Sequence, residues 1–180
     1  QRQMCIRDRL GGEATLEPTN TAPWPLSTWP GSTPGSAIGP VGRAELSVLD
    51  LGTGSGAIAL ALKATRPDLR VWASDMSSAA LAVAQANARR LQLELRFCQG
   101  CWFAALPADA PLFDCIACNP PYIAMHDPHL AALRFEPLSA LTSGADGLDD
   151  LRRIISDAPA YLNAGGWLLL EHGFDQAEQT

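Results

Sequence analysis

The chain has 180 residues, of which 47% are hydrophobic and 18% charged, which suits one α/β domain and is too short for two ordinary ones. No stretch approaches the ~20 apolar residues of a membrane span, and the N-terminus lacks the apolar region of a secretory signal, so we expect a cytoplasmic protein without membrane attachment. The formal net charge of −6 disfavours direct binding to DNA or RNA, whose partners present basic surfaces.

The first 44 residues differ in composition from the rest of the chain. Residues 11–42 hold six Pro and six Gly, and their apolar residues follow neither a strand nor a helix period. The charges of residues 2–9 are compatible with a helix start, but they lack an apolar face to dock. We therefore predict a disordered or non-native leader over 1–44 and a folded domain over 45–180.

From residue 45 onward, short apolar runs alternate with helical patterns. Such repeated strand and helix units predict a doubly wound, mostly parallel sheet of the Rossmann-like type. Ligands in that architecture bind at the carboxyl ends of the strands. The predicted strands cover 46–51, 70–74, 94–98, 113–118 and 167–172, and the predicted helices cover 57–65, 79–91 and 147–162.

A glycine-rich turn follows the first predicted strand of this domain. Glycines there allow a sharp turn and let a ligand approach the backbone without meeting a Cβ atom. Asp75, at the end of the next strand, offers acceptors for ribose hydroxyls. The sequence therefore predicts a site for an adenosine-type nucleoside. Its candidate residues are Asp50, Gly52, Thr53, Gly54, Ser55, Gly56 and Asp75.

The segment Asn119-Pro120-Pro121-Tyr122 follows the strand 113–118. Proline restricts its own backbone and that of the residue before it, so the segment is a pre-shaped extended turn. The Asn119 side-chain oxygen and the neighbouring Pro120 carbonyl together can accept both hydrogens of an NH2 group. The Tyr122 ring can cover the flat group that carries it. This pattern predicts a cradle for a planar nitrogen nucleophile.

The nucleoside site alone leaves the cofactor open. Residues 52–57 also satisfy the G-x-G-x-x-A pattern of NAD-binding proteins. An extra glycine at position 56, the acidic Asp50 inside the preceding strand, and the nitrogen cradle at Asn119 weigh against hydride transfer. Together, D-L-G-T-G-S-G at 50–56 and N-P-P-Y at 119–122 resemble the motifs of class I methyltransferases that use S-adenosylmethionine.

Further motifs narrow the resemblance to the PrmC/HemK family, which methylates the glutamine side-chain amide of the Gly-Gly-Gln motif in class I peptide chain release factors. The resemblance covers residues 46–180. The segments that carry it are W-F-x-A-L at 102–106, N-P-P-Y-I at 119–123, D-P-H-L at 127–130, R-F-E-P-L-x-A-L at 134–141, G-x-D-G-L at 144–148 and L-L-L-E-H-G at 168–173.

The resemblance implies roles for individual residues. The glycine turn would pack against the methionine part of S-adenosylmethionine, and Asp75 would hold its ribose. Trp102 would lie beside the adenine, and Asn119 would touch both cofactor and substrate. The segment 119–122 would bind the substrate glutamine. Class I release factors would be the protein partners, in translation termination, and no metal is implied.

The chain also departs from the family pattern. Cys101 stands where the family usually has an acidic residue, which puts one adenine contact in doubt. The helical N-terminal domain that recognises the release factor, the I-P-R-P-E-T-E-like segment before the glycine turn, and the last two strands of the sheet have no counterpart. We therefore expect a piece that is truncated at both ends and that has reduced or no activity by itself.

Two rival functions start from the same residues. The cradle at Asn119 would also suit an exocyclic amino group of DNA or RNA, with Tyr122 stacking on a flipped base. The pairs Cys98/Cys101 and Cys115/Cys118 approach the spacing of a four-cysteine zinc module. However, an odd separation within a strand points Cys115 and Cys118 to opposite faces of the sheet, so we expect buried free thiols. A metal at His126 and His129 is a minority interpretation.

Overall fold

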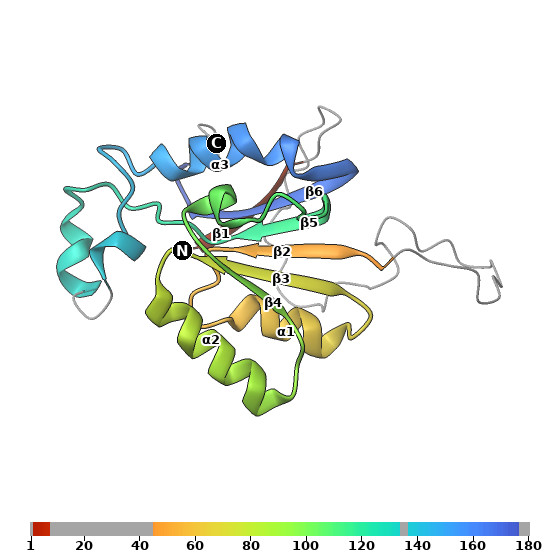
Figure 1. Cartoon of the computed structure of the whole chain (residues 1–180). Coiled ribbons are helices and arrows are strands. Elements are labelled where there is room, and N and C mark those ends of the chain that lie inside the picture. The colour runs from red at the N-terminus through yellow and green to blue at the C-terminus, as the bar shows by residue number, and fades with distance from the viewer. Residues whose placement is uncertain (1, 8–44, 134–136, 177–180) are drawn as a thin grey trace, which may run out of the picture.

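The computed structural model describes residues 2–7, 45–133 and 137–176. Its centre is a six-stranded sheet with the order β1-β6-β5-β2-β3-β4 (Figure 1). All neighbouring strands are parallel except β1 and β6. The strands are β1 (Arg2–Arg7), β2 (Ser47–Leu51), β3 (Arg70–Asp75), β4 (Arg96–Gln99), β5 (Phe113–Cys118) and β6 (Leu162–Gly173).

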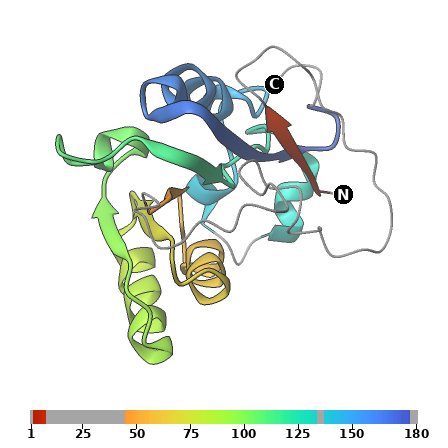
Figure 2. The same ribbon diagram turned by 90° about the vertical axis from the view of Figure 1, so that its right-hand side faces the viewer.

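Helices cover both faces of this sheet, which confirms the predicted doubly wound architecture. In Figure 1, α1 (Ala57–Thr65) and α2 (Ser78–Leu91) lie on one face and α3 (Asp149–Asp157) lies on the other, and Figure 2 shows the same three layers from the side. Short 3-10 helices complete the connections. They are η2 (Trp102–Ala105), η3 (Pro128–Leu133), η4 (Leu138–Ala140) and η5 (Ala158–Ala160).

Each face of the sheet has its own apolar core, because strand side chains alternate between the two faces. On the α3 face, Leu49, Leu51 and Ile116 pack with Leu151 and Ile154. On the α1 face, Val48, Val71 and Cys115 pack with Ala59 and Leu69. The central strands are buried on both sides, as expected for parallel strands between helices.

The helix bounds 57–65 and the strand bounds 113–118 match the prediction, whereas the last helix and strand differ from it. The helix predicted over 147–162 begins at Asp149 and ends at Asp157, followed by η5. Gly147 has φ +80°, outside helical geometry, and Pro159 lacks the amide hydrogen that a helix interior needs. The strand predicted over 167–172 extends over 162–173, with an irregular segment opposite the start of β5.

Residues 2–7 correct part of the prediction for the leader. They form β1, which pairs antiparallel with β6 from Arg2 opposite Gly173 to Arg7 opposite Leu168. The sheet therefore has six strands where five were expected, and residues 2–7 contain no helix. Periodicity could not reveal this strand, because its pairing partner lies more than 150 residues away. Residues 8–44 lie outside the described part of the chain.

Within the described residues, no helix combines the length and the apolar character needed to cross a membrane.

Candidate functional site

The glycine turn connects β2 to α1 and is tied to β3. Gly52, Gly54 and Gly56 have φ values of +77°, +56° and +88°, a region that favours glycine. The amides of Gly52 and Thr53 donate to the Ser74 carbonyl at 2.9 and 2.8 Å. A Cβ atom at Gly54 would meet nothing within 4 Å. The turn is thus rigidly held and open on the side of Gly54.

Asp50 supports this turn from the protein interior. Its side chain is buried, and its Oδ2 accepts hydrogen bonds from the Thr53 hydroxyl at 2.6 Å and from the Ala59 amide at 3.0 Å. Burial raises the pKa of the Asp50 carboxyl, although both hydrogen bonds act in the opposite direction. Asp50 therefore joins the turn to the first residues of α1 and acts on a ligand only through the turn.

Asp75 lies at the end of β3, directly beside the turn. Its Oδ2 accepts a hydrogen bond of 2.8 Å from the Gly54 amide, and its Oδ1 accepts one of 2.8 Å from the Ser77 amide. Ser77 in turn caps α2, since its hydroxyl accepts from the Ala80 amide at 3.2 Å. Each carboxylate oxygen has a second lone-pair direction. Asp75 therefore still has acceptor capacity for ligand hydroxyls after both backbone contacts are made.

Trp102 forms a further wall of the site. Its φ of +48° is unusual for a non-glycine residue, and its indole nitrogen donates to Asp150 Oδ1 at 2.9 Å. A Cβ atom at position 52 would lie only 3.3 Å from the Trp102 ring. The indole is thus held between Asp150 on α3 and the start of the glycine turn.

The Asn119-Pro120-Pro121-Tyr122 segment leaves β5 at the same edge of the sheet. Asn119 is exposed, and within the described part of the chain its side chain has no hydrogen-bond partner. Pro120 is buried, and Tyr122 is half-buried with its hydroxyl donating to Glu171 Oε1 at 3.3 Å. The amide group of Asn119 is therefore available to a ligand, while Tyr122 is anchored to β6.

A single cavity of about 480 Å³ brings many of the predicted residues together. Of the candidates named from the sequence, Gly52, Gly54, Ser55, Asp75, Trp102, Asn119 and Pro121 line it, as does Cys101. Asp50, Thr53, Gly56, Pro120 and Tyr122 are not among its lining residues. The cavity opens at the carboxyl ends of β2, β3 and β5, where the predicted architecture puts a ligand site.

Sequence reasoning missed several residues of this cavity. Met76, Ser77, Ala80 and Val83 contribute from the start of α2, and Pro137, Ser139 and Ala140 contribute from η4. Asp150 completes the lining from α3. The helix cap at Ser77 was the one signal in the sequence that could have indicated the residues from α2. A helix that begins directly after a strand starts at the same edge of the sheet as the glycine turn.

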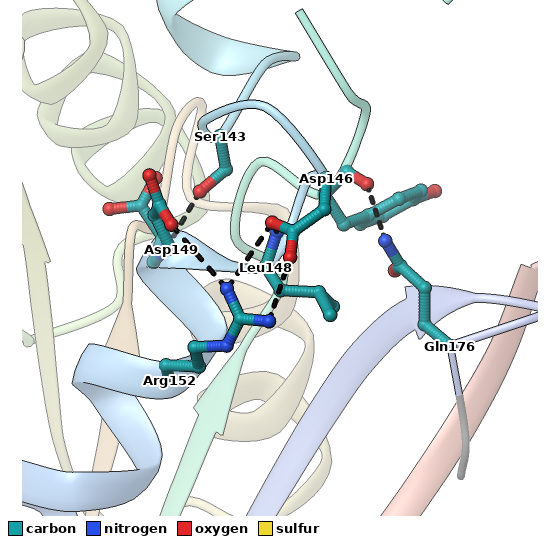
Figure 3. A network of polar contacts seen from close by, with 8 residues as sticks. Ser143, Asp146, Leu148, Asp149, Arg152 and Gln176 are labelled. Atoms are coloured by element: carbon teal, nitrogen blue, oxygen red, sulfur yellow. Dashed lines mark hydrogen bonds and ion pairs between the residues drawn. The ribbon is translucent and has the colours of Figure 1, made fainter. Parts of the chain in front are cut away.

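A network of polar contacts supports the loop that precedes α3 (Figure 3). The Ser143 hydroxyl accepts from the Asp150 amide at 2.7 Å. Arg152 pairs with Asp146 at 2.7 Å and with Asp149 at 3.6 Å. Asp146 also accepts from the Leu148 amide at 3.1 Å. This network fixes the N-terminal turn of α3 and thereby the position of Asp150.

Among the described residues, the four cysteines at positions 98, 101, 115 and 118 are free thiols. Cys115 packs on the α1 face and Cys118 on the α3 face of the sheet, so the two sulfur atoms point apart as predicted. Burial raises the pKa of the Cys115 thiol to about 12 and that of Cys118 well above its ordinary value. No group of three or more potential ligands for a metal gathers among the residues described.

Comparisons with known proteins identify relatives of this chain. A sequence model of the methyltransferase small domain matches residues 41–135. A release factor glutamine methyltransferase of Xylella fastidiosa strain 9a5c is 56% identical over 135 residues, which cover 73% of this chain and 48% of that protein. A release factor glutamine methyltransferase of Bordetella pertussis is 54% identical over 139 residues, which cover 76% of this chain and 51% of that protein. The chain thus spans about half the length of the curated relatives it matches.

A solved structure also resembles the described fold. The crystal structure of a methyltransferase from Pyrococcus furiosus has a TM-score of 0.53 and 20% sequence identity, and the match covers 71% of this chain and 55% of that one. At this identity the likeness concerns the fold alone. It agrees with the predicted fold class, a doubly wound, Rossmann-like sheet.

Proposed function

Because the chain belongs to the methyltransferase small-domain family, we propose that it binds S-adenosylmethionine and directs a methyl group to the side-chain amide of glutamine in the Gly-Gly-Gln motif of class I release factors. One observation supports the proposal most strongly. The amide of Asn119, which is exposed and has no hydrogen-bond partner among the described residues, lines the same cavity as Gly54 and Asp75. A nucleoside site and an acceptor for N–H groups thus share one cavity.

The cofactor would lie across the carboxyl ends of β2 and β3. The open side of Gly54 admits the methionine part, and the remaining lone pairs of Asp75 accept the ribose hydroxyls. Trp102, which lines the same cavity, would lie beside the adenine. Cys101 also lines the cavity, and its thiol is a weaker hydrogen-bonding group than the carboxylate common in the family. When bound, S-adenosylmethionine supplies an electrophilic methyl group on a sulfonium leaving group.

The substrate nitrogen would be oriented by the turn after β5. An amide nitrogen is a weak nucleophile, because its lone pair is shared with the carbonyl. Asn119 Oδ1 and the Pro120 carbonyl would accept hydrogen bonds from its two N–H groups, so that the lone pair faces the methyl group. The new nitrogen–carbon bond would form as the carbon–sulfur bond breaks with release of S-adenosylhomocysteine, and the methylated nitrogen would then lose its proton to solvent. A neutral Asn suffices, since no base is needed before attack.

The electrostatics favour a protein substrate over nucleic acid. Residues 45–180 carry 16 acidic and 9 basic side chains, and a phosphate backbone would be repelled by such a surface. A cytoplasmic location belongs to the same proposal, because the described thiols are free and release factors act in translation.

Transfer of a labelled methyl group tests this function directly. The chain is incubated with labelled S-adenosylmethionine and a class I release factor, the same factor with its Gly-Gly-Gln glutamine changed to Ala, DNA, or RNA. The Xylella fastidiosa relative serves as the positive control for the unchanged release factor. We expect label on the unchanged release factor alone.

Three outcomes separate the alternatives. Equal label on the Ala variant would exclude the glutamine as the acceptor, and label on nucleic acid would favour the exocyclic amine. No transfer by the chain where the relative is active, together with measurable binding of S-adenosylmethionine, would restrict the chain to cofactor binding.

A further inference from the structure

The turn over residues 119–122 has few backbone donors of its own. Pro120 and Pro121 carry no amide hydrogen, so these two residues can be tied to the protein only through their carbonyls and the residues that follow. After the turn, the Ile123 amide donates to the Leu141 carbonyl at 2.9 Å and the Ser143 amide donates to the Ile123 carbonyl at 3.0 Å. The carbonyl of Tyr122 lies between the turn and these contacts.

Gln176, just beyond β6, holds that carbonyl. Its Nε2 donates to the Tyr122 carbonyl oxygen at 2.9 Å, and its Oε1 accepts from the Gly173 amide at 2.8 Å. The two contacts determine the orientation of the Gln176 side-chain amide. Its oxygen must face the N–H group of Gly173, and its nitrogen must face the carbonyl of Tyr122. The Gln176 amide also donates to the Gly173 carbonyl at 3.0 Å. Gln176 is 8% exposed, so this bridge is shielded from water.

Gly147 makes room for the same hydrogen bond. A Cβ atom at this position would clash with the Tyr122 carbonyl oxygen and would lie 3.0 Å from Gln176 Nε2. Gly147 therefore lies next to both partners of this hydrogen bond. Figure 3 shows Gln176 next to the loop that carries Asp146 and Leu148. Two segments distant in sequence thus meet at one carbonyl.

We propose that Gln176 is a positioning residue, which holds the Tyr122 carbonyl and thereby keeps Asn119 and Pro120 in the orientation that methyl transfer requires. This role rests on the proposed function for its effect on turnover, but its effect on the turn does not depend on any substrate. Gln176 is outside the cavity lining and reaches the turn through its hydrogen bond to the Tyr122 carbonyl.

Gln176→Glu is the sharpest test, because the carboxylate keeps an acceptor for Gly173 and loses the donor for Tyr122. We expect faster hydrogen exchange of the amides at 122–125, with unchanged exchange at 47–75. With a methyl acceptor, kcat should fall about 10-fold to 100-fold, as displacement of reacting groups predicts, while the Kd for S-adenosylmethionine stays within about twofold. Gln92→Glu, at an exposed site, is the matched control.

Gly147→Ala tests the same bridge from the other side. It should reproduce the exchange pattern of Gln176→Glu, and the double variant should lose less than the sum of the two free-energy changes. Gly165→Ala is the control for backbone strain, since Gly165 has φ +77° and open space around a Cβ atom. Unchanged exchange at 122–125 in Gln176→Glu would overturn the proposal, as would faster exchange with unchanged kcat.

A chain that methylates no release factor would remove the proposed function, yet the exchange experiment would still decide whether Gln176 holds the turn.

Discussion

Asp75 Oδ2 accepts a hydrogen bond of 2.8 Å from the Gly54 amide, so the acidic residue of β3 and the glycine turn after β2 form one unit. The cofactor proposal gives Asp75 two tasks, to shape the turn and to accept ribose hydroxyls. Both tasks need oxygen acceptors, but only the second changes when a ligand binds.

Asp75→Ala should therefore weaken binding of S-adenosylmethionine about 5-fold to 150-fold, which corresponds to the ~1–3 kcal/mol of a hydrogen-bonded charged group. Asp75→Asn should lose less, since one acceptor oxygen remains. Calorimetry with S-adenosylmethionine and NADH measures the effect, and the exposed Asp109→Ala is the control. Binding of NADH with no heat from S-adenosylmethionine would reject the proposed cofactor.

Gly54 and Gly165 separate cavity blocking from backbone strain. Both have positive φ, and a Cβ atom at either position meets nothing within 4 Å. Alanine at either position should lower the free energy of unfolding by about 1 kcal/mol, because the backbone there is left-handed. Only Gly54→Ala puts a methyl group at the cavity wall, so only this variant should lose cofactor affinity. Thermal unfolding and calorimetry on both variants give the comparison, and equal affinities would argue against a ligand at Gly54.

The contact between Trp102 and Asp150 predicts a second-site effect on the cofactor. Asp150→Ala removes the acceptor of the indole hydrogen, so the Trp102 ring should lose its fixed orientation and the affinity for S-adenosylmethionine should fall about 5-fold to 10-fold. Asp150→Asn keeps an acceptor oxygen and should retain most of the affinity. Asp157→Ala, at the exposed end of α3 and outside the Asp146–Arg152 network, is the control. An effect of Asp157→Ala equal to that of Asp150→Ala would point to the charge of α3 instead.

The sequence predicted the parts of the site that local chemistry determines. Glycines at 52, 54 and 56 indicated a sharp turn, and the structure has one, with positive φ at all three positions. Asp75 and Asn119 follow parallel strands, and the carboxyl ends of such strands meet at one edge. The strand bounds of β5 were also correct, because a continuously apolar run is typical of a buried parallel strand.

Contacts between loops were not predictable in the same way. Trp102 and Asp150 are 48 residues apart, and neither belongs to a pattern with a period. Gln176 reaches Tyr122 only because β6 ends beside the turn. The β1 strand depends on an edge of β6 that no local signal describes. In each case tertiary placement decides which polar groups meet.

Asp50 should make stability depend on pH in a defined direction. Burial raises the pKa of its carboxyl in the folded state, so the folded state holds the proton more tightly than the unfolded state. The resulting stabilisation is fully present below the ordinary aspartate pKa of about 3.9. It is lost as the pH rises through the higher pKa of the folded state.

The Asp50→Asn variant has no ionisable group at this position. The free energy of unfolding of the unchanged chain, minus that of the variant, should therefore fall as the pH rises through this window and become constant above it. Urea unfolding at a series of pH values measures the difference, with Asp109→Asn as the exposed control. A difference that increases with pH would mean that the Thr53 and Ala59 hydrogen bonds outweigh burial.

Asn119 provides the most direct test of the proposed chemistry. Its side chain is exposed and has no partner within the described residues, so Asn119→Ala should leave the melting temperature nearly unchanged. It should lower kcat by on the order of 10², because orientation of the nucleophile is felt mainly in the transition state. Asn119→Asp keeps the acceptor oxygen and should retain more activity than Ala. Since the chain spans about half of its curated relatives, the same substitutions are made in the Xylella fastidiosa protein. Methyl transfer to a release factor at an unchanged rate by the Ala variants would exclude Asn119 as the group that orients the amide.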